Sequence, residues 1–488
     1  MTSKRIATSL FAAALALAPA SGAFAAEVQI INADPAGVGL NDPTAAAPVG
    51  GNTGTTRGQQ RLNVLLRAAQ IWADNLISAV PIVIRAQTAS QFCDATSAVL
   101  ASAGANAINR DFAGAPFAGT WYHGALANAI AGVDLQPGVH DIQTQFNLNL
   151  DNDPACLGGA GWYYGFDHNE GNQSDLLATM LHEYGHGLGF ANFVNEQTGT
   201  LNAGFPDVYS TFTRDLETDE DWNPMTNAER QASAINDPDV VWTGPNVTAA
   251  VPVFLDNVSI VTVNSPPAIA GVLEAQPAAF GPPVPSAGLT DTVILAVDGG
   301  GVSVNDGCEA ISNGGAISGN IALIDRGNCN FNVKVANAQA VGAVAVLIGN
   351  NQAGLPPMGG ADPTITIPSV GITQAAATAI KGQTPSPGVS VTLGYDPANF
   401  AGTKEGFLRL NAPNPLVAGS QISHWTPAAN PSLLMEPAIT PALTDDVDLT
   451  LEQFKDIGWT LSLLFKDGFE SGCFLAWDVV QNNTPCTN

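Results

Sequence analysis

Residues 181–190 read LHEYGHGLGF and contain the sequence HExxH, with a glycine three residues after the second histidine. On a helix, His182 and His186 lie one turn apart on the same face, so both imidazoles can reach one metal ion. Glu183 lies beside them, where its carboxylate can take a proton from a water molecule that attacks a peptide carbonyl. The stretch therefore predicts a zinc site on a helix.

The flanking residues support this helix. Ser174 or Asp175 can cap its start, and apolar residues then recur at helical spacing: Leu177, Leu181, Tyr184 and Leu188. HExxH fixes only three positions, so it is moderately specific by itself and needs further ligands elsewhere in the chain.

A catalytic zinc ion usually has three protein ligands and one open position for water. In the compact pattern HExxHxxGxxH, the third ligand lies six residues after the second histidine. Here Gly189 keeps its place, but Asn192 occupies the ligand position and is a poor zinc ligand. We therefore expect a distant third ligand. His424 is the candidate, because its segment, SHWTPAANPSLLMEP, continues to Met435.

These segments resemble the leishmanolysin branch of the metzincin metalloproteases, in which an insertion separates the HExxHxxGF helix from the third histidine and a Met-turn follows it. The resemblance covers the helix, the SHW segment, the Met-turn and the late stretch DLTLEQFKDIGW. It implies three ligands for Zn²⁺: His182, His186 and His424. It also implies that Glu183 is the general base and acid, and that Met435 forms an apolar floor beneath the metal.

Each residue also has a simpler interpretation. His424 can be a surface histidine beside a packing tryptophan, Trp425, and Met435 can be ordinary core filler. The other histidines are expected to serve locally: His123, His140 and His168. Among them, His168 is the best substitute ligand if His424 fails, because it shortly precedes the helix.

The first 25 residues predict export. They contain Lys4 and Arg5, an apolar run and the small-residue site Ala23-Phe24-Ala25, which together are typical of a secretory signal peptide. No later stretch reaches about 18 uninterrupted apolar residues, so we expect no membrane insertion. Removing the signal changes the formal net charge from −27 to −29 (−27 − 2). Such an acidic surface repels nucleic acid and anionic membranes.

The 6 cysteines suggest disulfides in an exported chain. Proximity along the chain and domain logic favour three pairs: Cys93 with Cys156, Cys308 with Cys329, and Cys473 with Cys486. The spacing of the cysteines does not resemble that of a metal-binding cluster.

The first half of the chain has the periodicities of a mixed fold. A helix is expected from Gln59 to Leu76, followed after Pro81 by the strand IVIRAQ. The stretch HDIQTQFNLNL alternates in the manner of a half-buried edge strand. It is expected either to pair with extended substrate, as such strands do in metzincin-like proteins, or to be a plain structural strand.

The 237 residues between His186 and His424 (424 − 186 − 1) are too many for a loop. Within them, residues 320–351 predict a strand, a helix from about Phe331 and a second strand, a βαβ unit. These residues resemble the protease-associated (PA) domain pattern RGxCxFxxKxxxAxxxGAxAxI. The matching positions are Arg326, Gly327, Cys329, Phe331, Lys334, Ala338, Gly342, Ala343, Ala345 and, slightly displaced, Ile348. The resemblance implies an interaction module without catalytic residues, or a passive spacer.

The expected fold class is α+β, with a metzincin-like domain of a twisted sheet plus zinc helix, split by an inserted α/β PA domain. The expected boundaries are residues 1–25 (signal), 26–247 and 399–466 (catalytic domain), 248–398 (PA domain) and 467–488 (tail).

The predicted function is a secreted, extracellular or periplasmic, zinc endopeptidase acting on protein or peptide substrates, expected to be a monomer. Two alternatives stay open: an aminopeptidase with a PA domain, and a non-catalytic extracellular binding protein on a protease fold. The intact HExxH argues against the first, since two-zinc aminopeptidases use dispersed ligands, and retention of Glu183 argues against the second.

Overall fold

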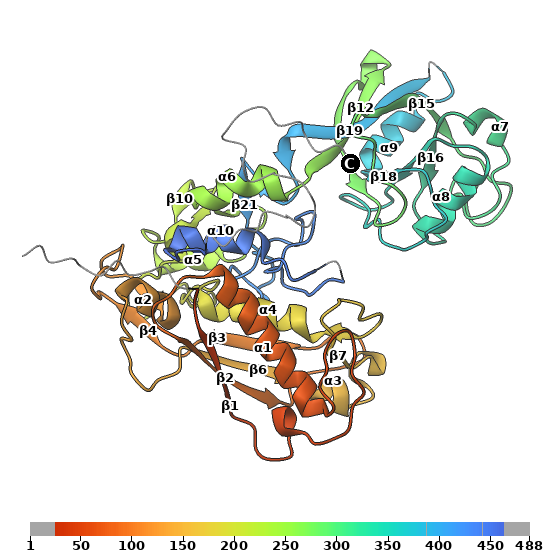
Figure 1. Cartoon of the computed structure of the whole chain (residues 1–488). Helices are drawn as coiled ribbons and strands as arrows, with labels where there is room; N and C mark the ends of the chain where they lie inside the picture. Colours follow the sequence, from red (N-terminus) through yellow and green to blue (C-terminus); the bar gives the residue numbers. More distant parts are fainter. Residues whose placement is uncertain (1–24, 387, 442, 463–488) are drawn as a thin grey trace, which may run out of the picture. The chain divides into compact units, whose positions relative to one another are not determined.

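The structure, a computed structural model, describes residues 25–386, 388–441 and 443–462. The chain divides into two compact units: residues 1–211 with 439–488, and residues 212–438 (Figure 1). Almost all of the expected signal peptide, the tail and the expected pair Cys473–Cys486 lie outside the described residues. Within the described part, no helix is both long and apolar enough to cross a bilayer.

The first unit is built on a four-stranded sheet in the order β1-β2-β6-β3. β1 (Val28–Asn32), β2 (Ile82–Ala89) and β6 (Ile142–Asn147) run parallel, and β3 (Ala101–Ala105) pairs antiparallel with β6 at the sheet edge. The expectation that the alternating stretch around β6 is an edge strand is wrong, because β6 has partners on both sides. The alternation indicates that one face of β6 is packed and the other is less buried. It does not indicate whether β6 lies at the edge of the sheet.

Two long helices pack against this sheet and against each other: α1 (Arg57–Asn75) and α4 (Leu176–Leu188) (Figure 1). Thr56 caps α1 by accepting the backbone N–H of Gln59. Of the apolar stripe expected on this helix, Leu65, Ala69 and Trp72 are buried, Leu62 is partly buried and Leu66 is exposed. The indole N–H of Trp72 donates to the carbonyl of Leu181 on α4 at 3.1 Å. The contact joins the two helices near the HExxH residues.

The end of the described chain returns to the first unit. α10 (Asp448–Ile457) places Phe454 against Trp72, with ring centroids 5.1 Å apart. The indole N–H of Trp459 donates to the carbonyl of Leu188 at 3.0 Å. The C-terminal helix therefore covers α1 and the end of α4.

Shorter elements complete the first unit: η1 (Gly39–Asn41), β4 (Ile108–Arg110), β5 (Trp121–His123), α2 (Gly124–Ala131), α3 (Asn149–Asn152), η2 (Cys156–Gly159), β7 (Trp162–Tyr163) and β8 (Ser174–Asp175). A disulfide joins Cys93 to Cys156, as the sequence predicted. Arg61 of α1 is 1% exposed and its guanidinium contacts Asp151 at 2.6 Å, which makes a buried ion pair.

The second unit contains a five-stranded sheet in the order β10-β9-β11-β21-β20. Its strands are β9 (Thr213–Asp215), β10 (Glu220–Asp221), β11 (Val240–Trp242), β20 (Thr403–Lys404) and β21 (Phe407–Arg409). α5 (Asn227–Ser233) and α6 (Pro245–Phe254) belong to the same region, and η3 (Ser210–Phe212) immediately precedes β9. The sheet therefore joins residues before and after the large insertion.

The same unit holds an eight-stranded sheet in the order β13-β12-β19-β15-β16-β17-β18-β14. Its elements are β12 (Asn257–Ser265), η4 (Pro267–Ile269), β13 (Gly271–Glu274), β14 (Gln276–Pro277), β15 (Leu289–Leu295), α7 (Gly314–Ile317), β16 (Ile321–Asp325), α8 (Phe331–Ala340), β17 (Ala345–Gly349), β18 (Ser369–Ile372), α9 (Gln374–Lys381) and β19 (Val389–Phe400).

The sheet is covered on both faces. Along β16, Ile321 and Leu323 pack with α9 residues in one apolar core, whereas Ala322 and Ile324 pack with α8 residues in another (Figure 1). The predicted βαβ unit is confirmed, because β16 and β17 are parallel neighbours and α8 begins at Phe331. The disulfide Cys308–Cys329 is also confirmed.

The chain enters and leaves this sheet at one place. β12 and β19 are antiparallel neighbours, with Asn257 opposite Phe400. Just outside them, the backbone N–H of Ala401 donates to the carbonyl of Asp256 at 2.8 Å. The two ends of the segment therefore meet at a single hydrogen-bonded pair.

Candidate metal centre

α4 begins at a well-defined cap. The carboxylate of Asp175 accepts the backbone N–H groups of Leu177 at 2.7 Å and Ala178 at 3.2 Å. Of the two caps that the sequence allows, Asp175 is therefore the one used. The helix ends at Gly189, whose φ of +150° favours a residue without a side chain.

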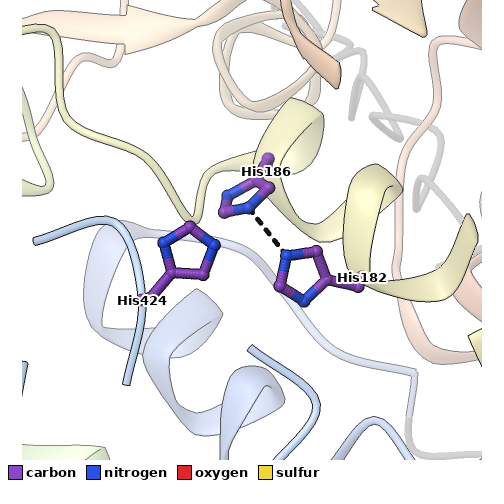
Figure 2. A group of neighbouring side chains, drawn as sticks. All are labelled: His182, His186 and His424. Atoms are coloured by element: carbon purple, nitrogen blue, oxygen red, sulfur yellow. Dashed lines mark hydrogen bonds between the residues drawn. The ribbon is translucent and has the colours of Figure 1, made fainter. Parts of the chain in front are cut away.

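The two histidines of the motif face each other one turn apart. The Nε2 atoms of His182 and His186 lie 3.0 Å apart, and the Nδ1 of His186 lies 2.8 Å from the carbonyl oxygen of Phe190 (Figure 2). That carbonyl requires a proton on Nδ1, so the Nε2 lone pair of His186 points toward His182. Two nitrogens bound to one tetrahedral zinc at about 2.0–2.1 Å lie about 3.3 Å apart, close to the observed spacing.

Burial sets the charge state of these rings. His182 is 6% exposed and His186 9% exposed. Burial lowers the pKa of His186 to about 4, although the hydrogen bond to Phe190 opposes the shift. The ring is therefore neutral near pH 7, which is the form that binds a metal ion.

Glu183 lies on the same helix and is also buried. Burial raises the pKa of Glu183 to about 8, while a hydrogen bond from the backbone N–H of Ala103 on β3 opposes the increase. A carboxyl with a pKa near the working pH can accept and return a proton, as a general base requires. The opposite charge of a nearby metal ion would lower this pKa again.

His424 and Met435 are held together in the second unit. The carbonyl of His424 accepts the backbone N–H of Asn411 at 2.9 Å. The residue after it, Trp425, donates its backbone N–H to the carbonyl of Met435 at 2.8 Å. Met435 is fully buried and His424 is 6% exposed. The backbone thus fixes the methionine next to the histidine segment.

The three expected ligands come from two parts of the chain. His182 and His186 lie on α4 in the first unit, and His424 lies in the second unit (Figure 2). Three imidazoles are a donor set found in catalytic zinc sites. The chemistry of these residues, and the spacing of His182 and His186, fit a zinc ion.

Asn192 has another role. Its amide N–H donates to Glu196 at 3.0 Å, and its carbonyl oxygen accepts the backbone N–H of Val194 at 2.8 Å. Glu196 is itself largely buried, and burial raises its pKa. Asn192, which occupies the third-ligand position of the pattern HExxHxxGxxH, therefore orders the loop after α4.

Sequence reasoning missed a buried acid in this loop. Asp207 is 1% exposed and accepts the backbone N–H groups of Phe193 at 2.8 Å and Ser210 at 2.7 Å. The hydroxyl of Ser210 also donates to Asp207 at 2.9 Å. The local pairing with Ser210 does not reveal the burial of Asp207, because burial depends on the loop that carries Phe193.

The other histidines have local roles. Hydrogen bonds to Asp175 at 2.7 Å and Asp445 at 3.1 Å raise the pKa of His168 to about 10, so its ring is protonated and unsuited to bind a metal. His123 is fully buried and packs on Phe193 with ring centroids 4.6 Å apart. Burial, and repulsion from His186 when that ring is protonated, lower the pKa of His123 to about 3, so His123 is neutral near pH 7.

Residues 289–380 match the PA domain family. "Signal peptide peptidase-like 2" of Arabidopsis thaliana is 37% identical over 127 residues, which is 25% of this chain and 23% of that protein. An "Aminopeptidase" of Pseudomonas aeruginosa (strain UCBPP-PA14) is 48% identical over 52 residues, 11% of this chain and 10% of that protein. The chain therefore spans less than a quarter of the length of these relatives.

Similar solved structures include BSAP, a zinc aminopeptidase from Bacillus subtilis, with 24% identity, a TM-score of 0.21, and coverage of 31% of this chain and 35% of that one. An aminopeptidase from Aneurinibacillus sp. strain AM-1 has 16% identity, a TM-score of 0.20, and coverage of 38% and 41%. TM-scores of 0.21 and 0.20 are too low to support an inference about the fold or activity of this chain. The PA domain match confirms that part of the sequence prediction: the chain has a mixed α/β fold with an inserted PA domain.

Proposed function

We propose that this chain is an exported zinc-dependent endopeptidase that cleaves protein or peptide substrates. The observation that carries the proposal is the pair of Nε2 atoms of His182 and His186, 3.0 Å apart, with the opposite nitrogen of His186 tied to the carbonyl of Phe190. A carbonyl behind a ligating imidazole fixes its tautomer and orientation, as it does in established metal sites. The third ligand in this proposal is His424.

A zinc ion held by these histidines would polarise the scissile carbonyl and make an attacking water more acidic. Glu183 then takes the proton from that water and delivers it to the leaving amine. Its burial and its hydrogen bond from Ala103 hold the carboxylate in one position for both steps.

The sheet edge supports cleavage within a chain. β3 is antiparallel to β6 and has no second partner among the described strands. An extended peptide can add to such an edge through backbone hydrogen bonds. Because the Ala103 N–H on β3 contacts Glu183, a peptide on this edge lies beside the general base. An edge strand binds the middle of a peptide, which favours an endopeptidase.

The segment after the insertion supports the leishmanolysin-like part of the proposal. The bond from Trp425 to the carbonyl of Met435 brings a buried methionine beside the third-ligand candidate, as expected for a Met-turn. The insertion between α4 and His424 contains the PA domain match. Both features agree with a metzincin whose third histidine follows an inserted domain.

An aminopeptidase is the second candidate. It is favoured by the 48% identity over 52 residues to the Pseudomonas aeruginosa aminopeptidase, although that match covers only 10% of the relative. A peptide with an acetylated N-terminus separates the two activities, because an aminopeptidase needs a free terminal amine and an endopeptidase does not.

The decisive experiment compares Glu183→Gln with wild type for zinc content, casein hydrolysis and cleavage of the acetylated peptide. We expect bound zinc to be retained and both activities to fall by ~10²–10⁴-fold, the usual contribution of general acid–base catalysis. Glu217→Gln, at an exposed position, is the matched control and should leave both unchanged. Activity of Glu183→Gln within tenfold (about 1.4 kcal/mol) of wild type would refute the assigned role. Failure of wild type to cleave the acetylated peptide would favour the aminopeptidase.

A further inference from the structure

A second group of possible metal ligands lies in the loop between β15 and α7, away from the histidines. Asp298, Asp306 and Glu309 each offer a carboxylate oxygen, and these oxygens all lie within 4.8 Å of one another. Asp298 and Asp306 are each 1% exposed, whereas Glu309 is exposed. The group is therefore buried on one side and open to solvent on the other.

Asp298 is the unusual member. Both of its carboxylate oxygens are buried, and no described residue donates a hydrogen bond to either. Removing an ionised carboxylate from water without a partner is costly, so buried carboxylates in proteins are normally paired or bind a metal. The nearby carboxylates of Asp306 and Glu309 increase the cost by repulsion. Asp298 can hydrogen-bond to the carboxylate of Asp306, a contact that lowers the pKa of Asp306, only if Asp298 itself is protonated.

Lys334 does not satisfy this carboxylate. Its ammonium group donates to the carbonyls of Asp306 at 2.5 Å and Gly327 at 2.6 Å, and to the sulfur of Cys308 at 3.3 Å. An ammonium group has three N–H donors, and these contacts use all of them. Lys334 balances one of the three negative charges at long range and leaves Asp298 without a donor.

Asp306 is oriented in the manner of a metal ligand. It accepts hydrogen bonds from the amide of Asn328 and from the backbone N–H of Cys308. These hydrogen bonds fix the direction of the Asp306 carboxylate, as supporting contacts do for known ligands.

A glycine lies beside Glu309. Gly301 has φ +76°, and a Cβ placed there would lie 2.6 Å from a carboxylate oxygen of Glu309. The positive φ favours glycine at this position, whereas the exposed Glu309 side chain could move away from a Cβ.

We propose that Asp298, Asp306 and Glu309 bind a calcium ion in the PA domain. The donors are all oxygens, which suit Ca²⁺ and Mg²⁺ better than Zn²⁺. Oxygens at about 2.3–2.6 Å from one Ca²⁺ ion can be at most about 5 Å apart, which agrees with the observed limit. Water can supply further ligands on the open side. Mg²⁺ requires a tighter octahedron and fits an open loop less well.

The ion would brace the loop that carries one disulfide cysteine. Cys308 lies between two of the ligands and is bonded to Cys329, just before α8. Binding would therefore fix the loop to β15 and α8 from two sides. The proposal does not rest on the peptidase activity.

The first test is calorimetric titration of CaCl₂ into the full-length, zinc-loaded protein after calcium is removed with EGTA, with zinc content checked before and after. We expect one site with Kd ~10⁻⁴–10⁻³ M, as in extracellular modules. Asp298→Asn and Glu309→Gln should each weaken calcium binding at least tenfold. Glu274→Gln, an exposed position in the same sheet, should bind as wild type does. No calcium uptake by wild type, or equal binding by all variants, would overturn the proposal.

The second test is thermal unfolding of the same proteins with EGTA or with 10-fold excess calcium over Kd. Without calcium, Asp298→Asn should unfold at or above the temperature of wild type, because it removes a buried unpaired charge. With calcium, wild type should gain stability and the variant should not. A variant that is less stable than wild type by the same amount in both conditions would show a purely structural aspartate. A larger gain with MgCl₂ than with CaCl₂ would also reject calcium as the ion.

Discussion

Asp175 connects His168 to the first turn of the HExxH helix. One of its oxygens lies 2.7 Å from Nδ1 of His168, and the other accepts the backbone N–H of Leu177 at 2.7 Å. The other ring nitrogen of His168 lies 3.1 Å from Asp445, shortly before α10. A protonated histidine thus joins the cap of α4 to the start of the C-terminal helix.

His168→Gln should lower the unfolding temperature in a pH-dependent way. The pKa of His168 is raised from 6.5 to about 10, so its charge stabilises the fold fully below about pH 6.5, and this contribution is lost as pH rises through 10. Unfolding followed by circular dichroism at pH 6, 8 and 10.5 should show the difference from wild type shrinking with pH. His140→Gln is the control. A difference that grew with pH would contradict the charged pair.

Arg61→Ala should destabilise the first unit by about 3–5 kcal/mol, because it leaves the carboxylate of Asp151, whose side chain is only 11% exposed, without its cation. Arg57→Ala, in the first turn of the same helix, should cost at most about 1 kcal/mol, since its contact with Asp42 is 3.8 Å and its side chain is 34% exposed. Urea unfolding measures both. Equal losses would show that Arg61 acts through packing alone.

His424→Ala should lose bound zinc and activity, whereas Asn192→Ala should keep both. The reason is that His424 is the proposed third ligand, while Asn192 orders its own loop through Glu196 and Val194. Metal analysis of purified protein gives the answer. Zinc loss from Asn192→Ala with retention in His424→Ala would place the third ligand near α4 and remove the leishmanolysin comparison.

Replacing residues 257–400 by a short glycine linker should leave a protein that binds zinc and cleaves small peptides. The reason is the hydrogen bond from Ala401 to Asp256, which places the two cut ends together. Zinc content and the rates on a peptide and on casein should be compared with wild type. A larger change on casein would assign the PA domain a role with large substrates, and equal changes would make it a spacer. Loss of zinc would show that the domain supports the His424 segment.

Local signals predicted most of what the structure shows. Asp175 caps α4 because its side chain accepts the backbone N–H groups of Leu177 and Ala178, and α8 begins at Phe331, as the sequence predicts. The two described disulfides follow from proximity along the chain and from domain logic.

Pairing between distant strands could not be predicted from the sequence. β3, Ala-Ser-Ala-Gly-Ala, contains none of the residues that favour strands and forms because β6 supplies its hydrogen-bond partners. The sequence therefore predicts the edge of the sheet at β6, although β3 forms it. From the sequence, Asp207 and Asp298 would be expected to be solvated loop residues. Both are buried, because burial depends on segments far away in sequence.

The return of the C-terminal helix to the first unit has a consequence for biosynthesis. Trp72 on α1 packs against Phe454, 382 residues later in the chain (454 − 72), and the backbone N–H of Ile77 donates to the carbonyl of Thr460. A nascent chain cannot bury this surface until its last helix has been synthesised. The end of the HExxH helix therefore gains its contact with Trp459 only near the end of translation, after most of the polypeptide has left the ribosome.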